Sequence, residues 1–426
     1  MTTYLKHSPL ALFDTLEVML DHKPDLDTLI DKAQLPLSAK DDYSYVYDFL
    51  LSYRGSPATF NSYRRELERL LHWSWLVIGR SLKKITRTDF ESFVEFCQNP
   101  PIAWIGSKNV ARFIDQGGSR VPNSNWRPFV VSVDKVSHSE GTEADPKKYT
   151  LSQKAIQAIF SVISSFYNYL IQESYVDSNP VAQIRQKSKF IRKNQGKVVI
   201  RRLSELQWGY VIETVEEMAA DEPAVHERSL FIINALYGMY LRISELAASP
   251  RWQPQMGHFY CDNDGSWWFT TVGKGNKERI ISVSNAMLAA LRRYRKSLGL
   301  PSLPHVGETT PLLSKTIGRG PVTSTRQIRT IVQKCFDATV ERMRSHGFVD
   351  EVEQLRAATV HWLRHTGISD DVKHRPREHV RDDAGHGSSA ITDQYVDVEL
   401  RARHASAKYK ILNPFSEEKN LGSTEK

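Results

Sequence analysis

The chain has 426 residues, of which 40% are hydrophobic and 25% charged, as is typical of a folded globular protein with two or more domains. Its three cysteines are scattered, which argues against a disulfide framework or a zinc cluster. No apolar run approaches the roughly 18 residues of a membrane span, and the N-terminal segment lacks a signal-peptide pattern. We therefore expect a cytoplasmic protein that does not contact a membrane.

The net charge of +8 is unevenly distributed. Residues 1–40 are mildly acidic, whereas residues 41–200 hold most of the basic excess. The segment 185–202 (RQKSKFIRKNQGKVVIRR) contains eight Lys or Arg residues and no acidic residue. Such a run is usually a solvated linker, but it also suits a chain that crosses a phosphate backbone between two domains.

The first part of the chain predicts helices. Residues 1–40 read as a short helical lead-in. Ser56 followed by Pro57 is a helix-start signal, and the apolar residues after it recur at three- or four-residue steps. Residues 86–98 predict a second amphipathic helix.

Residues 99–149 are rich in Pro, Gly, Ser and Asn, and they predict an irregular insertion. Within it, 128–133 (PFVVSV) is a possible short strand. A long helix is expected from Ser152, with one apolar face, and it should end at 177–180 (DSNP).

The second half predicts a mostly helical domain with one small sheet. Two strand-like runs, 267–272 and 279–284, flank the turn sequence GKGNKE and predict a hairpin. The expected helices are 203–219, 227–241, 285–298, 324–346, 352–371 and 376–384. The fold class is therefore mainly α with a small β-sheet (α+β).

Two stretches place single cations in unusual positions. Arg242, in YGMYLRISELAAS, lies at an apolar helix junction, where an unpaired charge would be costly, so the simplest interpretation is an ion pair with Glu245. Lys274, in VGKGNKERI, lies at the tip of the predicted hairpin, where lysines are usually only solvated.

A third stretch, TVHWLRHTG, puts His361 and Arg364 on one helical face. His361 and His365 are four residues apart, a spacing that suits a metal. However, Trp362 stands where a zinc hydrolase has glutamate and no third ligand is evident, so we expect no metal site.

A fourth stretch, AGHGSSAITDQYVDV, places His386 nine residues before Tyr395. Alone, it would predict a helix end followed by a surface tyrosine. Together, however, the four stretches supply what breakage of a phosphodiester requires: a nucleophile, cations for the phosphate and an acid for the leaving oxygen.

These residues resemble the catalytic set of the tyrosine recombinases, which include phage-type integrases and Xer-like site-specific recombinases. The match rests on Arg in LRISEL, Lys in VGKGNKERI, His-x-x-Arg in HWLRHTG, and Gly-His followed by Tyr, in the family's order and with similar gaps. It covers roughly residues 200–412. AGH replaces the more usual Leu-Gly-His, and RHTGIS lacks the family's aromatic-Ala-Thr, but neither departure removes a catalytic group.

The resemblance implies that Tyr395 attacks the scissile phosphate, giving a 3′-phosphotyrosine link and a free 5′-hydroxyl. It implies that Arg242, Arg364 and His386 stabilise the transition state. His361 would assist proton transfer and Lys274 would be the acid. The covalent link stores the bond energy, so no metal, nucleotide or other cofactor is expected.

The resemblance also implies a helical core-binding domain and a catalytic domain that clamp DNA. The expected segments are a helical lead-in (1–40), a core-binding domain (41–184) with an insertion (99–149), a basic linker (185–202), a catalytic domain (203–412) and a polar tail (413–426). Expected DNA-backbone contacts from the linker are Lys189, Arg192, Lys193, Arg201 and Arg202.

The partners implied are double-stranded DNA and three further protomers, in a homotetramer or a hetero-assembly with related recombinases on synapsed DNA. The protein would be nucleoid-associated. The lead-in and the insertion make the chain longer than a minimal Xer-like enzyme, which favours integration or excision of a mobile element.

Two alternatives remain open. A type IB topoisomerase uses a similar constellation to relax DNA without exchanging partners, and it would not assemble into a tetramer. A non-catalytic DNA-binding regulator of the same fold would normally have lost one of the six catalytic residues, and none is lost here.

Overall fold

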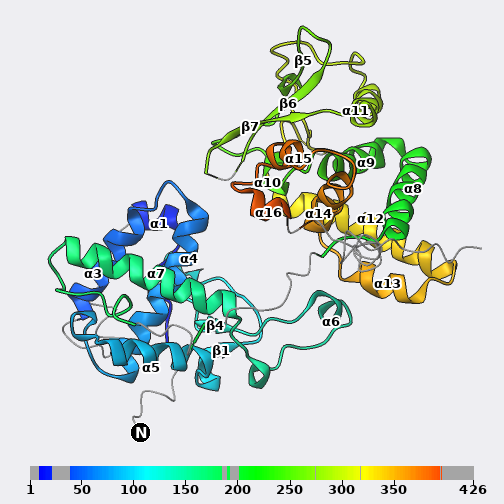
Figure 1. Ribbon diagram of the computed structural model, residues 1–426. Coiled ribbons are helices and arrows are strands. Elements are labelled where there is room, and N and C mark those ends of the chain that lie inside the picture. Colours follow the sequence, from blue (N-terminus) through cyan, green and yellow to red (C-terminus); the bar gives the residue numbers. More distant parts are fainter. Residues whose placement is uncertain are drawn as a thin grey trace, which may run out of the picture. The chain divides into compact units, whose positions relative to one another are not determined.

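The computed structural model describes residues 9–21, 39–184, 190–191, 201–273, 275–316, 318–393 and 395. The chain divides into two compact units, residues 1–196 and 197–426, and each has its own hydrophobic core (Figure 1). No helix in the described ranges is both long and apolar enough to cross a membrane.

The first unit is built on three helices that pack against one another, α3, α4 and α7. Its helices are α1 (Leu16–Asp21), α3 (Ala39–Leu51), α4 (Pro57–His72), α5 (Arg87–Gln98), α6 (Lys135–Ser139) and α7 (Gln153–Gln172). Short helical turns are η2 (Trp73–Val77), η3 (Leu82–Lys84), η4 (Ile102–Trp104) and η5 (Pro146–Lys148). The apolar faces of α4 and α7 meet in the core because their hydrophobic residues recur at helical spacing.

The helix starts follow local capping chemistry. The side chain of Ser152 accepts a hydrogen bond from Ala155 N, 3.2 Å away, at the start of α7. Pro57 is the first residue of α4 as expected, but Ser56 does not cap it, because its hydroxyl bonds the Thr59 hydroxyl instead. The long helix ends at Gln172, before the expected DSNP stop.

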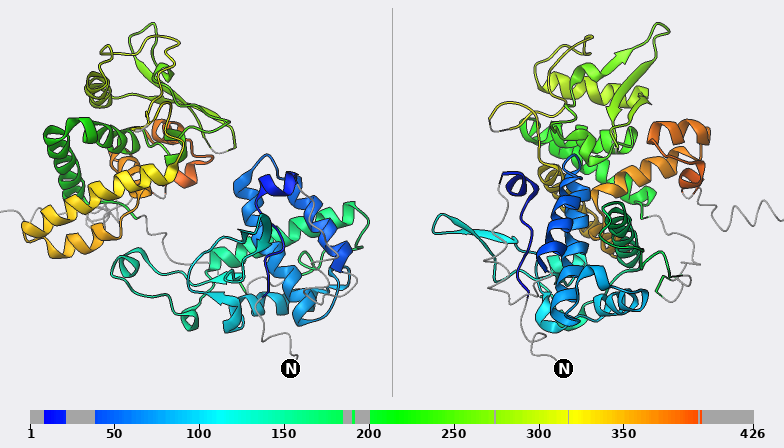
Figure 2. Two further views of the ribbon diagram at one scale, coloured as in Figure 1. Left: turned by 180° about the vertical axis from the view of Figure 1, so that it is seen from behind. Right: turned by 90° about the vertical axis from the view of Figure 1, so that its left-hand side faces the viewer.

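The insertion at 99–149 contains more regular structure than predicted. Within it, β1 (Ile105–Gly106) pairs in parallel with β4 (Phe129–Val130). The expected strand at 128–133 is thus shortened to two residues. A second pair, β2 (Phe113–Gln116) and β3 (Ser119–Pro122), forms an antiparallel hairpin around two glycines of positive φ, visible as the projecting cyan ribbon in Figure 2.

The second unit is helical, with a three-stranded antiparallel sheet in the order β5-β6-β7. Its strands are β5 (Phe259–Cys261), β6 (Trp267–Val272) and β7 (Glu278–Ser282), and its helices are α8 (Glu205–Asp221), α9 (Pro223–Gly238), α10 (Ile243–Leu246), α11 (Asn285–Ser297), α12 (Thr325–Ser345), α13 (Val349–Arg356), α14 (Val360–Asp371), α15 (Arg377–Ala384) and α16 (Ser389–Asp393). A short turn, η7 (Met256–His258), precedes β5. The predicted hairpin is present, whereas β5 and α16 were not predicted.

One prediction about the second unit is wrong. Residues 352–371 were expected to form one helix, but α13 ends at Arg356 and α14 begins at Val360. The backbone of Thr359 is extended (φ −124°, ψ 167°), which turns the chain between them. No Gly or Pro marks the break, so the sequence carries no local signal for it.

The central helix of this unit is α9, which packs against α8, α11 and α14. The contact with α14 is so close that a methyl group at Gly367 would overlap the backbone carbonyl oxygen of Tyr237. Only glycine fits there, because a backbone atom cannot rotate away as a side chain does.

Gly367→Ala should therefore lower the free energy of unfolding by about 1–3 kcal/mol, as overpacked core sites do. Urea unfolding monitored by circular dichroism measures this. The control is Gly209→Ala in α8, where an added methyl meets no atom within 4 Å and helix propensity favours alanine by up to about 1 kcal/mol. Equal effects of the two substitutions would show that α9 and α14 separate without cost.

Candidate active site

Tyr395 points into the second unit. Its side chain is 7% exposed and packs with Tyr240, Ile368, Val380 and Ala384. Tyr395 is therefore not the surface tyrosine that this stretch alone would suggest. Burial raises the pKa of the Tyr395 hydroxyl, and the nearby Arg364 and Arg242 oppose that rise.

The hydroxyl of Tyr395 lies within hydrogen-bond distance of a histidine. His365 Nδ1 is 2.6 Å from the Tyr395 oxygen. Burial lowers the pKa of His365 to about 4, with smaller contributions from His361 and Arg364, so its imidazole is neutral and Nδ1 can accept the tyrosine proton. From the sequence we considered His365 only as a metal ligand.

A second histidine, His386, packs against the Tyr395 ring. Its imidazole stacks on Tyr395 with 5.6 Å between ring centroids and 19° between the planes, and its Nδ1 is 2.9 Å from Thr392 Oγ1. Burial, and then the charges of Arg364, Arg242 and Arg279, lower the pKa of His386 to about 4. The structure thus brings His386 and Tyr395 together.

Arg364 extends from α14 into the core of the site, where it is 5% exposed. It donates hydrogen bonds to two backbone carbonyls, those of Tyr240 and Ala384, the second at 2.6 Å. Burial lowers the pKa of Arg364 to about 9, and the positive charges of Arg242 and Arg279 add to the effect. Placing cations this close has a cost that an incoming anion would offset.

Arg242 is held by a buried carboxylate. Its guanidinium lies 3.0 Å from Glu245 Oε1, as the sequence predicted, and its backbone N–H donates to Oε2 at 2.7 Å. The same carboxylate, 1% exposed, accepts a bond of 2.7 Å from Arg279. Arg279 was not singled out from the sequence, although it also donates to the Ala384 carbonyl.

The turn that follows β6 begins beside this arginine pair. A side chain at Gly273 would come within 3.1 Å of Glu245 Oε1 and 3.4 Å of Arg242 Nη1, so the chain enters the turn in direct contact with the site. Lys274, the next residue, lies outside the described residues.

His361 differs from the other predicted residues. It is exposed, and its ring centroid is 6.3 Å from that of His365 rather than against Tyr395. Among the linker residues, Lys189, Arg192 and Lys193 lie outside the described residues. Arg201 is exposed, whereas Arg202 is half-buried.

The chemistry of the site follows from these contacts. A tyrosine hydroxyl with a proton acceptor 2.6 Å away lies near Arg364 and Arg242, and a second histidine stacks on its ring. Guanidinium groups match the oxygens of phosphate, and tyrosine oxygen is a nucleophile once deprotonated. The arrangement suits attack by Tyr395 on a phosphate held by the arginines.

No family model matches the chain, but the curated proteins that it resembles are tyrosine recombinases. A tyrosine recombinase XerC of Thermodesulfovibrio yellowstonii is 27% identical over 278 residues, covering 63% of this chain and 78% of that protein. XerC of Chlorobaculum parvum is 21% identical over 258 residues, covering 58% and 70%. XerC of Pediococcus pentosaceus, 29% identical, is matched over only 52% of its own length.

Among solved structures, the XerH site-specific recombinase bound to a palindromic difH substrate, in a post-cleavage complex, superposes with a TM-score of 0.52 at 14% identity. The alignment covers 95% of this chain and 99% of that chain. At this identity the likeness shows a shared fold.

The low pKa values of His365 and His386 predict a pH dependence of stability. Between pH 6.5 and about 4 the unfolded chain binds protons at these imidazoles that the folded chain does not, so stability falls as the pH falls through that range. Urea unfolding at a series of pH values should show a shallower loss in the His365→Gln/His386→Gln double variant than in the wild type. Identical pH profiles would contradict the assignment of buried, neutral histidines.

Proposed function

We propose that this chain, whose curated relatives are tyrosine recombinases, is itself one and cuts and rejoins DNA at specific sites through a covalent link between DNA and Tyr395. The observation that carries the proposal is the 2.6 Å contact of the Tyr395 hydroxyl with His365 Nδ1 inside a cluster of arginines. We further propose integration or excision of a mobile element as its role, because of the lead-in and the insertion at 99–149.

In the proposed reaction the oxygen of Tyr395 attacks the scissile phosphorus. A bond forms between that oxygen and the phosphorus, and the bond from the phosphorus to the 5′-oxygen breaks. The products are a 3′-phosphotyrosine link and a strand end with a free 5′-hydroxyl. The reverse attack by a 5′-hydroxyl rejoins the strand. The number of phosphoester bonds is conserved, so the exchange needs no external energy source.

His365 is the proposed acceptor of the tyrosine proton. In the free protein its pKa is too low for it to be a strong base, because burial and neighbouring cations disfavour the imidazolium. A phosphate bound near Arg364 and Arg242 brings negative charge, which raises the pKa of both histidines. The same phosphate therefore serves as the substrate and makes His365 a stronger base.

The charge that develops on the phosphate is the proposed target of Arg242, Arg364 and His386. Preorganised donors of this kind stabilise a transition state most when they need no rearrangement during the reaction. Glu245 supplies that order by fixing Arg242, and Arg279 beside it. Lys274 remains our proposed acid for the leaving 5′-oxygen.

His361 takes an assisting role in proton transfer in this proposal. Double-stranded DNA is the substrate, and we propose a tetramer, of identical or related protomers, as the assembly that exchanges strands between two duplexes.

Tyr395→Phe should abolish covalent complex formation with DNA and leave DNA affinity within a few-fold of wild type, because only the nucleophilic oxygen is removed. The assay is denaturing gel electrophoresis after incubation with nicked duplexes made from the DNA that flanks the gene. Tyr409→Phe is the matched control and should retain the adduct. Recovery of a DNA-linked peptide that contains Tyr409 instead of Tyr395 would overturn the assignment.

His365→Ala should slow strand cleavage by about 10²- to 10⁴-fold near neutral pH, the usual contribution of a general base. The deficit should shrink as the pH rises towards the ordinary tyrosine pKa of about 10, because hydroxide then removes the proton. Single-turnover cleavage rates over a pH series measure this, with His361→Ala as the comparison. A pH-dependent deficit confined to His361→Ala would assign the base to His361.

A further inference from the structure

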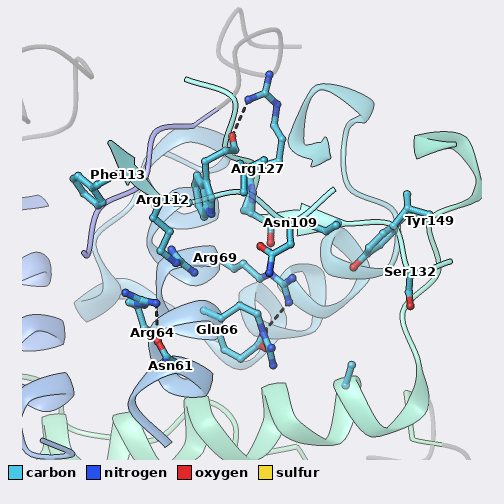
Figure 3. Close-up of a pocket in the computed structure, with 18 of the residues that line it drawn as sticks. Asn61, Arg64, Glu66, Arg69, Asn109, Arg112, Phe113, Arg127, Ser132 and Tyr149 are labelled. Carbon is cyan, nitrogen blue, oxygen red and sulfur yellow. Dashed lines mark hydrogen bonds and ion pairs between the residues drawn. The ribbon is translucent and has the colours of Figure 1, made fainter. Parts of the chain in front are cut away.

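The first unit contains a second cluster of cations, which the catalytic proposal does not use. A cavity of about 920 Å³ lies between α4, the first turn of α7 and the insertion at 99–149 (Figure 3). We call it the arginine pocket, and the arginines that line it are Arg64, Arg65, Arg69, Arg112, Arg120 and Arg127. Among the described residues that line it, only Asp14 and Glu66 carry carboxylates.

The insertion is fixed to the rest of the unit around this pocket. Arg69, on α4, donates to the backbone carbonyl of Pro128 at 2.9 Å. Arg112, from the insertion, pairs with Glu68 of α4, and Arg120, from β3, pairs with Asp14 at 2.6 Å. Half of the arginines therefore come from the insertion, and two of these three, Arg112 and Arg120, are held by carboxylates outside it.

Two of the arginines form no hydrogen bond or ion pair with a carboxylate among the described residues. Arg64, 8% exposed, bonds the Asp14 backbone carbonyl and Asn61 Oδ1, while its buried Nε has no hydrogen-bond partner. Arg127 bonds only backbone carbonyls, those of Ser124 and Trp126, each at 2.7 Å. Burial, and then the charge of Arg112, lower the pKa of Arg64 to about 10, although the carboxylates of Glu68, Asp14 and Glu17 oppose the shift.

An unpaired buried cation is costly, and an anion in the pocket would offset that cost. The planar guanidinium donates two parallel hydrogen bonds to phosphate oxygens, so a cluster of arginines favours phosphate over a smaller anion. The first turn of α7, a 20-residue helix, also lines the pocket and adds the positive end of a helix dipole.

We propose that the arginine pocket binds a backbone phosphate of the DNA duplex, so that the insertion gives this recombinase phosphate contacts of its own. The proposal rests on the proposed function, because that function makes DNA the substrate. Arg64 and Arg127 carry the contact, since they are the two arginines of the pocket that no carboxylate bonds among the described residues. The contact positions the protein on the duplex without reading bases.

Salt dependence of DNA binding tests this proposal. Each lost phosphate contact flattens the slope of log affinity against log salt concentration by about 0.9. The probe is a fluorescent duplex of arbitrary sequence, titrated with the full chain at several salt concentrations. The variants are Arg64→Gln and Arg127→Gln, and the control is Arg87→Gln, an exposed arginine of α5 in the same unit that does not line the pocket.

We expect a slope flatter by about one unit for Arg127→Gln and for Arg64→Gln, and an unchanged slope for Arg87→Gln. Because Arg64 is buried, circular dichroism accompanies each titration, and Arg127→Gln decides the question if Arg64→Gln unfolds. If both variants fold and both show the wild-type slope of log affinity against log salt, the proposal is overturned. If Arg64→Gln unfolds, a wild-type slope in Arg127→Gln alone overturns it.

A second measurement identifies the source of the phosphate. A thermal shift by inorganic phosphate that is lost in Arg127→Gln, with an unchanged DNA slope, would assign the pocket to a small phosphorylated ligand and overturn the DNA proposal. Failure of the proposed function is distinct: wild-type protein would form no covalent DNA adduct, whatever the slopes.

Discussion

The buried carboxylate of Glu245 is the constraint on which the catalytic cluster depends. It lies in α10, and one of its oxygens accepts a hydrogen bond from the guanidinium of Arg242 while the other accepts from the guanidinium of Arg279. Without it, two guanidinium groups and the buried Arg364 would repel one another in a region of low dielectric. The carboxylate therefore lets three cations converge beside Tyr395, and the surplus positive charge that remains is what a phosphate would neutralise.

Sequence order predicted the main elements of this arrangement. The structure brings together four residues that are widely spaced along the chain, Arg242, Arg364, His386 and Tyr395. They could be singled out from the sequence because their motifs follow the order known from the tyrosine recombinases. Arg279 was not singled out because its strand, β7, does not bury the residues that hydropathy would predict. The neighbouring Ile280 is 48% exposed, whereas Arg279 faces the site. The contact of His365 with Tyr395 depends on where the segment after α15 returns, which helical spacing within α14 does not reveal.

In the fold, too, elements set by local sequence were predicted, whereas elements set by tertiary packing were not. The start of α7 at Ser152 and the hairpin around GKGNKE follow from capping and turn chemistry, and both were predicted. The break between α13 and α14 was not, because residues 357–359 carry no Gly or Pro and the turn is imposed by packing against α9. The insertion likewise contains a parallel strand pair, β1 with β4, that joins residues more than 20 positions apart and that no local pattern encodes.

The carbonyl oxygen of Ala384 accepts hydrogen bonds from both Arg364 and Arg279 at the end of α15. This acceptor belongs to the backbone, so no exchange of side chains at position 384 deletes it, and a conventional mutational scan would report the position as unimportant. The contribution of this carbonyl can be measured by chemical protein synthesis. An ester in place of the amide between residues 384 and 385 makes the carbonyl oxygen a weaker hydrogen-bond acceptor and leaves every side chain unchanged. Two cations of the site are thus anchored by an atom that genetic variation cannot remove.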